Sequence, residues 1–339
     1  MLRVVVAGVS FPSLEPERDV FGRIGAEVAV ATDDADALAL AREADALLTD
    51  YFPVPADVVA ELRRCRVVCQ YGVGLDGIDI DAATAAGILV THTPAYCVDE
   101  LADHALALLL AVARKVTLYD RSVREGRWDY NVGPPMRSLR GRTLGLVGFG
   151  RTARALAQRV APLGLRPLAH DPLVAAETIA AAGAEPATLA RVLAESHIVS
   201  LHVPLTSETR GLLGAAELAA MKPGSILLNT ARGGLVDEDA LAAALREGRL
   251  AGAGLDVLAT EPPARDNPLL ALENVVVTPH AAFLSVESLI RVQRQAAEEV
   301  ARVLTGERPR HAVNMAALEG SKQNARVGAL LPDGLPKTP

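Results

Sequence analysis

The chain has 339 residues, of which 50% are apolar, and it carries a formal net charge of −7 at pH 7. This length exceeds the usual size of one hydrophobic core and indicates two domains. Acidic and basic residues are interspersed, so the chain has no basic face for nucleic acid or for an anionic membrane. We therefore expect a protein that binds neither nucleic acid nor membranes.

Cysteine usage and the start of the chain bear on where the protein works. The three cysteines, Cys65, Cys69 and Cys97, are too few for a disulfide framework, and they lack the second pair that a zinc site needs. We expect no metal site. Residues 1–6 read as a buried strand rather than a secretion leader, and the longest apolar run, residues 105–113, is too short to cross a bilayer. These features favour a cytoplasmic protein.

Short apolar strands alternate with longer helical patterns from the first residues onward. In this first series the expected strands are residues 4–7, 27–31, 46–48, 67–69 and 89–91, with amphipathic helices such as 34–44 and 56–63 between them. Such alternation is typical of a parallel α/β unit. A long helical pattern at residues 99–115 then leads into the rest of the chain.

A second alternating series follows. Its expected strands are residues 144–147, 166–170, 198–202, 225–229, 252–256 and 275–278. The series is long enough for a complete doubly wound domain. A last helical pattern covers residues 285–305, and periodicity is lost from residue 320 onward.

Residues 148–153 (GFGRTA) join the first strand of the second series to a helical pattern, and Asp171 follows about 20 residues later. Gly148 permits a tight turn, Gly150 leaves no Cβ between the backbone and a pyrophosphate, and the helix N-terminus attracts phosphate. Asp171 ends the next strand, where a carboxylate accepts both ribose hydroxyls and repels a 2′-phosphate. The pattern predicts a dinucleotide site that takes NAD rather than NADP.

Arg232, Glu261 and His280 follow three later strands, at the strand ends where parallel sheets collect ligands. A guanidinium grips a carboxylate, an imidazole transfers a proton near neutral pH, and a carboxylate beside the ring holds it and favours its charged form. Hydride transfer to a ketone needs these groups. Singly, each residue also has an ordinary interpretation: Arg232 as a helix cap, Glu261 as a solvated acid, and His280 as a turn histidine.

Several further motifs occur in one order from about residue 40 to about residue 315. They are residues 71–79 (YGVGLDGID), the fingerprint at 148–153, 201–206 (LHVPLT), 221–224 (MKPG), 229–233 (NTARG), 255–257 (LDV) with 261–262 (EP), and 278–280 (TPH). With this set the chain resembles the D-isomer-specific 2-hydroxyacid dehydrogenases. Residues 96–104 (YCVDELADH) and 280–283 (HAAF) most resemble the bacterial branch that is similar to C-terminal-binding proteins.

The resemblance implies roles for particular residues. Arg232 would bind the substrate carboxylate and the carbonyl oxygen. His280 would be the general acid and base, and Glu261 would pair with it and keep it protonated for reduction. Val73 and Gly74 would offer backbone N–H groups to the substrate carboxylate.

For the cofactor, the resemblance implies a larger set of residues along the bound NAD. The set is Gly148, Gly150, Arg151 and Thr152 at the pyrophosphate, Asp171 at the adenine ribose, Val203, Pro204 and Thr209 on the adenine side, Thr230, Ala231 and Asp256 toward the nicotinamide, and Cys97 near the nicotinamide ribose. Asp256 would hold the carboxamide. Phe283 stands where resembling sequences often carry Trp, which indicates a differently shaped pocket.

The fold expected from these features is α/β, with two Rossmann-like doubly wound parallel-sheet domains and a cleft between them. Residues 98–284 would form the NAD-binding domain, and residues 1–97 with 285–320 a discontinuous substrate-binding domain. Residues 321–339 would be a disordered tail, because Lys, Pro and Gly dominate there without periodicity.

The predicted function is that of an NAD-dependent D-2-hydroxyacid dehydrogenase, which transfers a hydride between NADH and a small 2-keto acid. The alternative is an NAD(H)-sensing, corepressor-like binding protein. We expect a homodimer built around the helix at 99–115, by resemblance and because its Ala and Leu surface is too apolar for solvent. On that helix we interpret His104 as a packing residue rather than a ligand.

Overall fold

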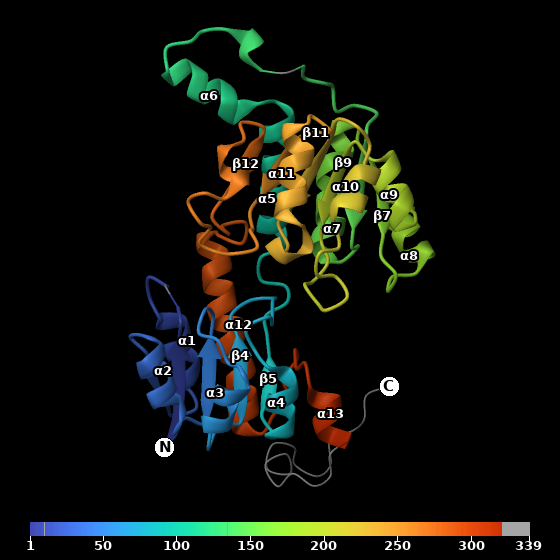
Figure 1. Cartoon of the computed structure of the whole chain (residues 1–339). Helices are drawn as coiled ribbons and strands as arrows, with labels where there is room; N and C mark the ends of the chain where they lie inside the picture. Colours follow the sequence, from blue (N-terminus) through green and yellow to red (C-terminus); the bar gives the residue numbers. More distant parts are fainter. Residues whose placement is uncertain (10, 134, 321–339) are drawn as a thin grey trace. The chain divides into compact units, whose positions relative to one another are not determined.

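The protein is described here by a computed structural model that covers residues 1–9, 11–133 and 135–320. Its contacts divide the chain into two units. Unit 1 comprises Met1–Tyr96 and the chain from Ser285 onward, and unit 2 comprises Cys97–Leu284. Within the described residues the strands form two parallel sheets, one of five strands in unit 1 and one of seven in unit 2 (Figure 1). The tail expected to be disordered, residues 321–339, lies outside the described residues.

Unit 1 is a parallel sheet in the order β2-β1-β3-β4-β5. Its strands are β1 (Leu2–Ala7), β2 (Ala26–Val30), β3 (Ala46–Thr49), β4 (Val67–Gln70) and β5 (Leu89–Thr91), and its helices are α1 (Glu15–Gly22), α2 (Asp34–Ala41), α3 (Ala56–Glu61), α4 (Ile80–Ala85), α12 (Val286–Thr305) and α13 (Met315–Gly320). The central strands β3 and β4 are buried along their whole length, as expected when helices cover both faces of a parallel sheet. Helix α12 completes this unit, because it packs against α1, β3, β4 and β5.

Unit 2 has the strand order β12-β11-β10-β9-β6-β7-β8. Its strands are β6 (Thr143–Val147), β7 (Arg166–His170), β8 (Glu185–Pro186), β9 (Ile198–Leu201), β10 (Ser225–Asn229), β11 (Leu250–Leu255) and β12 (Val275–Val277). Strand β6 lies between β7 and β9, and successive strands are added on one side of β6 first and then on the other. Ligands of doubly wound sheets bind at such a switch point.

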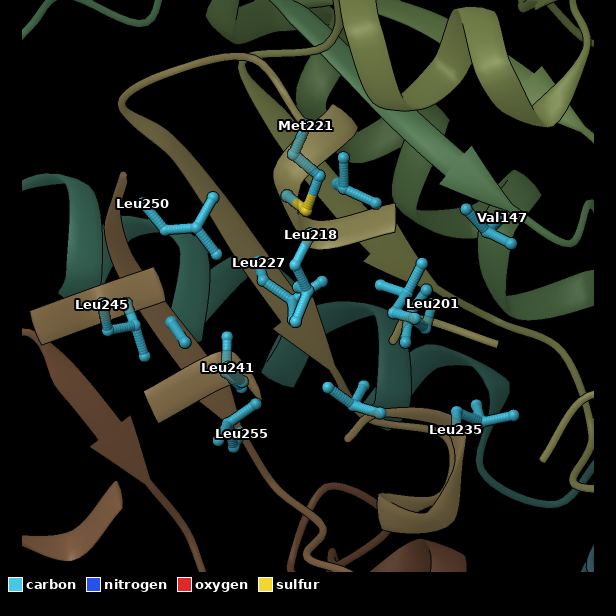
Figure 2. Packing of buried hydrophobic residues seen from close by; sticks show 14 of the residues in the cluster. Val147, Leu201, Leu218, Met221, Leu227, Leu235, Leu241, Leu245, Leu250 and Leu255 are labelled. Carbon is cyan, nitrogen blue, oxygen red and sulfur yellow. The ribbon is translucent and has the colours of Figure 1, made fainter. Parts of the chain in front are cut away.

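The helices of unit 2 cover both faces of its sheet. They are α5 (Val98–Ala113), α6 (Val116–Arg124), α7 (Arg151–Val160), α8 (Ala176–Ala181), α9 (Leu189–Glu195), α10 (Ala215–Ala220) and α11 (Glu238–Arg246), with short 3-10 turns η1 (Tyr130–Val132), η2 (Ala161–Leu163), η3 (Gly233–Leu235) and η4 (Pro268–Ala271). Figure 2 shows one side of this core, where Leu227 and Leu255 of the sheet meet Leu218, Leu241 and Leu245 of the covering helices. Each such leucine contributes about 1.5–3 kcal/mol by leaving water.

The expected strands are all present, with ends that differ by at most two residues, but some helices differ. The pattern at 34–44 ends at Ala41 in the structure, and the pattern at 56–63 ends at Glu61. The pattern at 99–115 stops at Ala113 because Lys115 adopts a left-handed conformation with φ 56°. Helix α6, which the sequence analysis did not anticipate, begins directly after it.

Helix α5 uses its apolar face inside unit 2. It packs on α7, β10 and β11, and Leu108 and Val112 are buried there. Its approach to β11 is close, since a Cβ on Gly252 would lie 2.7 Å from Val112 and a Cβ on Gly254 would lie 2.9 Å from Leu108. The same unit therefore already covers part of the apolar surface that suggested a subunit contact around residues 99–115, whereas Leu106 and Leu110 stay partly exposed. The subunit contact at this helix remains a prediction.

Candidate active site

Glu261 and His280 form a direct pair in unit 2. His280 Nδ1 lies 2.6 Å from Glu261 Oε2, and the other carboxylate oxygen accepts the backbone N–H of Leu258 at 3.0 Å. About one third of each side chain is exposed, so the pair is open to solvent on one side. Burial raises the pKa of Glu261. The hydrogen bonds from His280 and Leu258, together with the charges of His280 and Arg232, lower this pKa by more than burial raises it, so the net pKa is below 4.5. The pair therefore contains an ionised carboxylate at neutral pH.

His280 is held in an unusual backbone conformation. Its φ of 52° lies in the left-handed region, which costs a non-glycine residue about 1–2 kcal/mol. Its N–H donates to the carbonyl oxygens of Asp256, at 2.8 Å, and Thr278, at 3.0 Å. The buried carboxylate of Asp256 also accepts the N–H groups of Ala281 and Ala282, both at 2.9 Å. Asp256 thus fixes the turn that presents the imidazole.

His104 reaches the same turn from α5. Its Nε2 lies 2.9 Å from Thr278 Oγ1, and the threonine hydroxyl donates to Asp256 at 2.6 Å. Nε2 is also 3.4 Å from the Asp256 carboxylate. These contacts fit the interpretation of His104 as a satisfied packing histidine, and its hydrogen-bond partner is the turn that carries His280. The sequence signal for Thr278 was its place in the motif TPH, two residues before the histidine.

Arg232 follows β10 in a loop that Asn229 organises. The Asn229 amide donates to the carbonyl of Arg232 at 2.8 Å and accepts the N–H of Ala231 at 3.0 Å. The next residue, Gly233, packs so tightly that a Cβ there would lie 1.9 Å from the carbonyl carbon of Leu258. This contact joins the Arg232 loop to the loop that carries Glu261. The structure therefore brings Arg232, Glu261 and His280 into one neighbourhood.

The dinucleotide fingerprint lies between β6 and α7, at the switch point of the sheet. Gly148 has φ 88°, and a Cβ on it would lie 2.7 Å from the carbonyl oxygen of His202. Gly150 is the N-cap of α7, which has no side-chain cap, and a Cβ at Gly150 would meet nothing within 4 Å. There is thus open space beside Gly150, and the first N–H groups of α7, at Arg151 and Thr152, have no acceptor within the helix, as a pyrophosphate site requires.

Asp171 lies beside this loop, directly after β7. One of its carboxylate oxygens accepts the N–H of Phe149 at 2.8 Å and the other accepts the N–H of Leu173 at 2.9 Å. The acid is therefore fixed next to the fingerprint, where a ribose would follow the pyrophosphate. This donor and acceptor set fits NAD, and a second phosphate on the ribose would meet a negative charge.

The other predicted cofactor residues lie at the ends of neighbouring elements of unit 2. Val203 and Pro204 follow β9, and the Val203 side chain is 2.9 Å from the Cβ position of Gly148. The Thr209 hydroxyl donates to the Pro204 carbonyl at 2.6 Å. The remaining ones are Thr230 and Ala231, which follow β10, Asp256, which follows β11, and Cys97, which is the buried N-cap of α5.

Val73 and Gly74 belong to unit 1, in the loop that follows β4. Gly72 is fixed by Thr93, whose hydroxyl accepts its N–H at 2.8 Å and whose N–H donates to its carbonyl at 2.9 Å. The Val73 carbonyl lies 3.1 Å from a ring nitrogen of His92. Among the described residues, no acceptor receives the N–H groups of Val73 or Gly74. Two adjacent donors are thus presented at the carboxyl end of the sheet of unit 1.

A Rossmann sheet with a dinucleotide loop and an Arg, Glu and His set at its strand ends defines a nicotinamide-dependent dehydrogenase. The sequence profile described as "D-isomer specific 2-hydroxyacid dehydrogenase, NAD binding domain" matches residues 106–282. The chain belongs to the D-isomer-specific 2-hydroxyacid dehydrogenase family. It is an NAD-dependent oxidoreductase, and the alternative of a corepressor-like NAD(H) sensor is not favoured.

Curated relatives and solved structures agree with this assignment. The chain is 45% identical over 284 residues to a glyoxylate reductase of Korarchaeum cryptofilum, covering 83% of each protein. It is 42% identical to a D-3-phosphoglycerate dehydrogenase of Archaeoglobus fulgidus over 79% of this chain, but it spans only 51% of that relative.

Among solved structures, the TT0316 protein of Thermus thermophilus has a TM-score of 0.82 at 38% identity and covers 92% of this chain and 100% of its own. A D-lactate dehydrogenase of Aquifex aeolicus, complexed with NAD and lactic acid, has a TM-score of 0.81 at 27% identity and covers 94% of this chain and 98% of its own. Every helix in the described residues is too short or too polar to span a membrane.

Proposed function

We propose that the substrate is a small 2-keto acid of the glyoxylate or pyruvate class and that Arg232, Glu261 and His280 carry the chemistry. The observation that carries this proposal is the 2.6 Å pair between His280 Nδ1 and Glu261 Oε2, in the neighbourhood of Arg232. The names of similar proteins, a glyoxylate reductase and a D-lactate dehydrogenase bound to lactic acid, support the substrate class.

The three side chains have complementary tasks in reduction. The Arg232 guanidinium pairs with the substrate carboxylate and polarises the 2-keto carbonyl of the substrate. The ionised Glu261 accepts a hydrogen bond from the Nδ1–H of His280 and so orients the ring, which directs Nε2 toward the substrate. His280 donates the Nε2 proton to the carbonyl oxygen as C2 becomes tetrahedral. When bound, NADH would supply the hydride for C2, and the product would be the 2-hydroxy acid, of D configuration wherever C2 is a stereocentre.

Cofactor binding is assigned to the residues at the switch point of unit 2. Gly148, Gly150, Arg151 and Thr152 would hold the pyrophosphate, and Asp171 would accept the adenine ribose hydroxyls. Val203, Pro204 and Thr209 would lie toward the adenine, and Thr230, Ala231, Asp256 and Cys97 toward the nicotinamide end. Since three hydrogen bonds already engage the Asp256 carboxylate, we assign it first to the turn of His280 and second to the carboxamide.

Val73 and Gly74 are proposed to bind the substrate carboxylate by their N–H groups. A carboxylate is a strong acceptor, and adjacent backbone donors form a concave anion site at little cost because the loop is already fixed. The bonds from Thr93 to Gly72 and the contact of His92 with Val73 support this assignment.

A substrate panel tests the proposal. Glyoxylate, pyruvate, hydroxypyruvate and 2-ketobutyrate are assayed with NADH and with NADPH, and the chirality of the product is determined for the last three, since glycolate is achiral. His280→Ala should lower kcat by about 10²- to 10⁴-fold while NADH binding is retained. The control is His311→Ala in unit 1, which should leave kcat unchanged. Full turnover by the His280 variant would overturn the assignment.

We also infer a homodimer and a cytoplasmic location. The dimer contact is assigned to the segment that runs from α6 to η1 and projects from unit 2 (Figure 1). This segment exposes the apolar side chains of Val116, Val123, Trp128 and Tyr130. A monomeric mass in light scattering would remove this proposal. The three cysteines are buried, and none of them forms a disulfide within the described residues, which supports a reducing compartment. The motifs at 96–104 and 280–283 support placement in the branch similar to C-terminal-binding proteins.

A further inference from the structure

A buried polar cluster lies in unit 1 and includes Tyr71, the residue that opens the loop with Val73 and Gly74. Glu17 of α1 is 0% exposed, and its carboxylate accepts the Tyr71 hydroxyl at 2.8 Å. The Gln293 amide of α12 donates to both carboxylate oxygens, at 3.1 and 2.9 Å, and to the Ser13 carbonyl at 2.7 Å. The cluster thus joins two helices to the residue that opens the loop. No local sequence pattern marks the cluster, because its members are far apart in the chain.

This cluster is costly to maintain. A carboxylate without a paired cation loses its hydration on burial. A protein with apolar residues of similar volume in place of such buried groups is often at least as stable. Burial raises the pKa of Glu17, although the hydrogen bonds from Tyr71 and Gln293 oppose the rise. Gln293 already joins α12 to the start of α1 through Ser13, so helix packing alone does not require the acid.

Tyr71 is the part of the cluster that reaches the substrate loop. It follows β4 directly, its N–H donates to the Thr49 carbonyl at 2.8 Å, and its ring meets Phe11 edge-on at 5.0 Å. The backbone of Tyr71 is thus fixed by Thr49, and Glu17 fixes the hydroxyl end of its side chain. Two residues later, Val73 and its neighbour present their N–H groups.

We propose that Glu17 is a positioning residue for the substrate-carboxylate site, acting through Tyr71 on the N–H groups of Val73 and Gly74. This inference rests on the proposed function, in which those groups bind the 2-keto acid. Thr93 and His92 hold the loop from the β5 side, and the Glu17–Tyr71 bond holds it from the α1 side. Loss of that bond relaxes one side of the loop and weakens recognition of the carboxylate.

The test separates recognition of the substrate from catalysis and from folding. Tyr71→Phe removes one oxygen, and Glu17→Leu removes the acceptor. Both should raise KM for glyoxylate and the inhibition constant of oxamate, a carboxylate analogue of the substrate, by about fivefold or more. The value of kcat and the Kd of NADH should stay within about twofold of wild type, since the catalytic pair and the cofactor loop belong to unit 2.

Two variants serve as controls. Glu17→Gln keeps an acceptor for Tyr71 and should hold KM near the wild-type value. Tyr119→Phe removes the same atom from a partly exposed tyrosine whose hydroxyl donates to the Tyr130 carbonyl in unit 2, and it should change none of these constants. If Glu17 and Tyr71 act through their shared bond, the effect of the double variant Glu17→Leu with Tyr71→Phe on KM should be no larger than that of either single variant.

Each outcome decides between the positioning role and a structural one. Lowered Tm with unchanged KM in both variants would mean that the cluster only stabilises unit 1, and it would overturn the inference. If Glu17→Leu does not fold, Tyr71→Phe decides the matter alone. A wild-type protein that reduces no 2-keto acid would refute the proposed function and this inference together, whereas an active wild type with unaffected variants refutes only the inference.

Discussion

The Cβ that Gly148 lacks would lie 2.7 Å from the carbonyl oxygen of His202, which is closer than a Cβ carbon approaches a backbone oxygen. With φ 88°, the residue also adopts a conformation that suits glycine. Both constraints act at the turn that begins the dinucleotide loop. A side chain at this position therefore forces β6 and the segment after β9 apart.

Gly148→Ala tests this contact. The variant should lose more than about tenfold in NADH affinity, because the loop must shift, in addition to the roughly 1–2 kcal/mol of left-handed backbone strain. Fluorescence titration with NADH and urea unfolding measure the two effects.

The matched control is Gly183→Ala. Gly183 has φ 85°, but a Cβ there would meet nothing within 4 Å. It should show the strain without the loss of affinity. Equal NADH affinity in the two variants would contradict the proposed fit of the cofactor loop.

Glu261→Gln tests the ionised partner of His280. The variant should lower kcat by about 10- to 100-fold, because an amide orients the ring without a charge. Since the pKa of Glu261 is lowered on folding, its contribution to stability is present above its ordinary pKa of 4.5 and is lost as pH falls through the lower folded value.

The measurement is the free energy of unfolding as a function of pH. The stability advantage of wild type over Glu261→Gln should be greatest near neutral pH and should shrink toward pH 3. Glu273→Gln, which removes an exposed ion pair with Arg121, is the control for the loss of one carboxylate. A difference that does not vary with pH would contradict the assignment.

Asp171→Asn tests cofactor choice. The amide oxygen still accepts one backbone N–H, but the negative charge that repels a 2′-phosphate is gone. The ratio of kcat/KM for NADPH to that for NADH should rise by about tenfold or more, which corresponds to about 1.4 kcal/mol. Asp79→Asn, at the N-cap of α4, removes the same charge in unit 1 and should leave the ratio unchanged.

Thr278→Val tests the turn beneath His280. The substitution keeps the volume but removes the hydroxyl between His104 and Asp256, so kcat should fall by several-fold to about tenfold. The control is Thr305→Val, whose hydroxyl bonds only to the preceding turn of α12. A wild-type kcat in Thr278→Val would show that the Asp256 carboxylate holds the turn without this hydroxyl.

Much of the fold and of the site is readable in the sequence because local signals agree with one another. A strand, the pattern GFGRTA and an acid one strand later placed Gly148, Gly150 and Asp171 at one switch point, and the parallel topology implied that the residues following β10, β11 and β12 share one edge of the sheet.

Other features depend on contacts that no local pattern records. The left-handed Lys115 that separates α5 from α6 has no glycine to mark it, so one long helix was expected. The approach of His104 to Thr278 and of Glu17 to Tyr71 joins residues distant in the chain. The apolar face of α5 suggested a subunit surface, since periodicity shows that a face is buried but not by which partner.

The interrupted course of unit 1 also shapes how this protein is made. Unit 2 is one continuous stretch, Cys97–Leu284, and all of it has been synthesised before α12 emerges from the ribosome. The first 96 residues contain β3, β4 and β5 but not the helix that packs on them. Domains fold as units during synthesis, so residues 1–96 complete their fold only after unit 2 has been made, and the strand surface that α12 later covers is what a chaperone would have to shield.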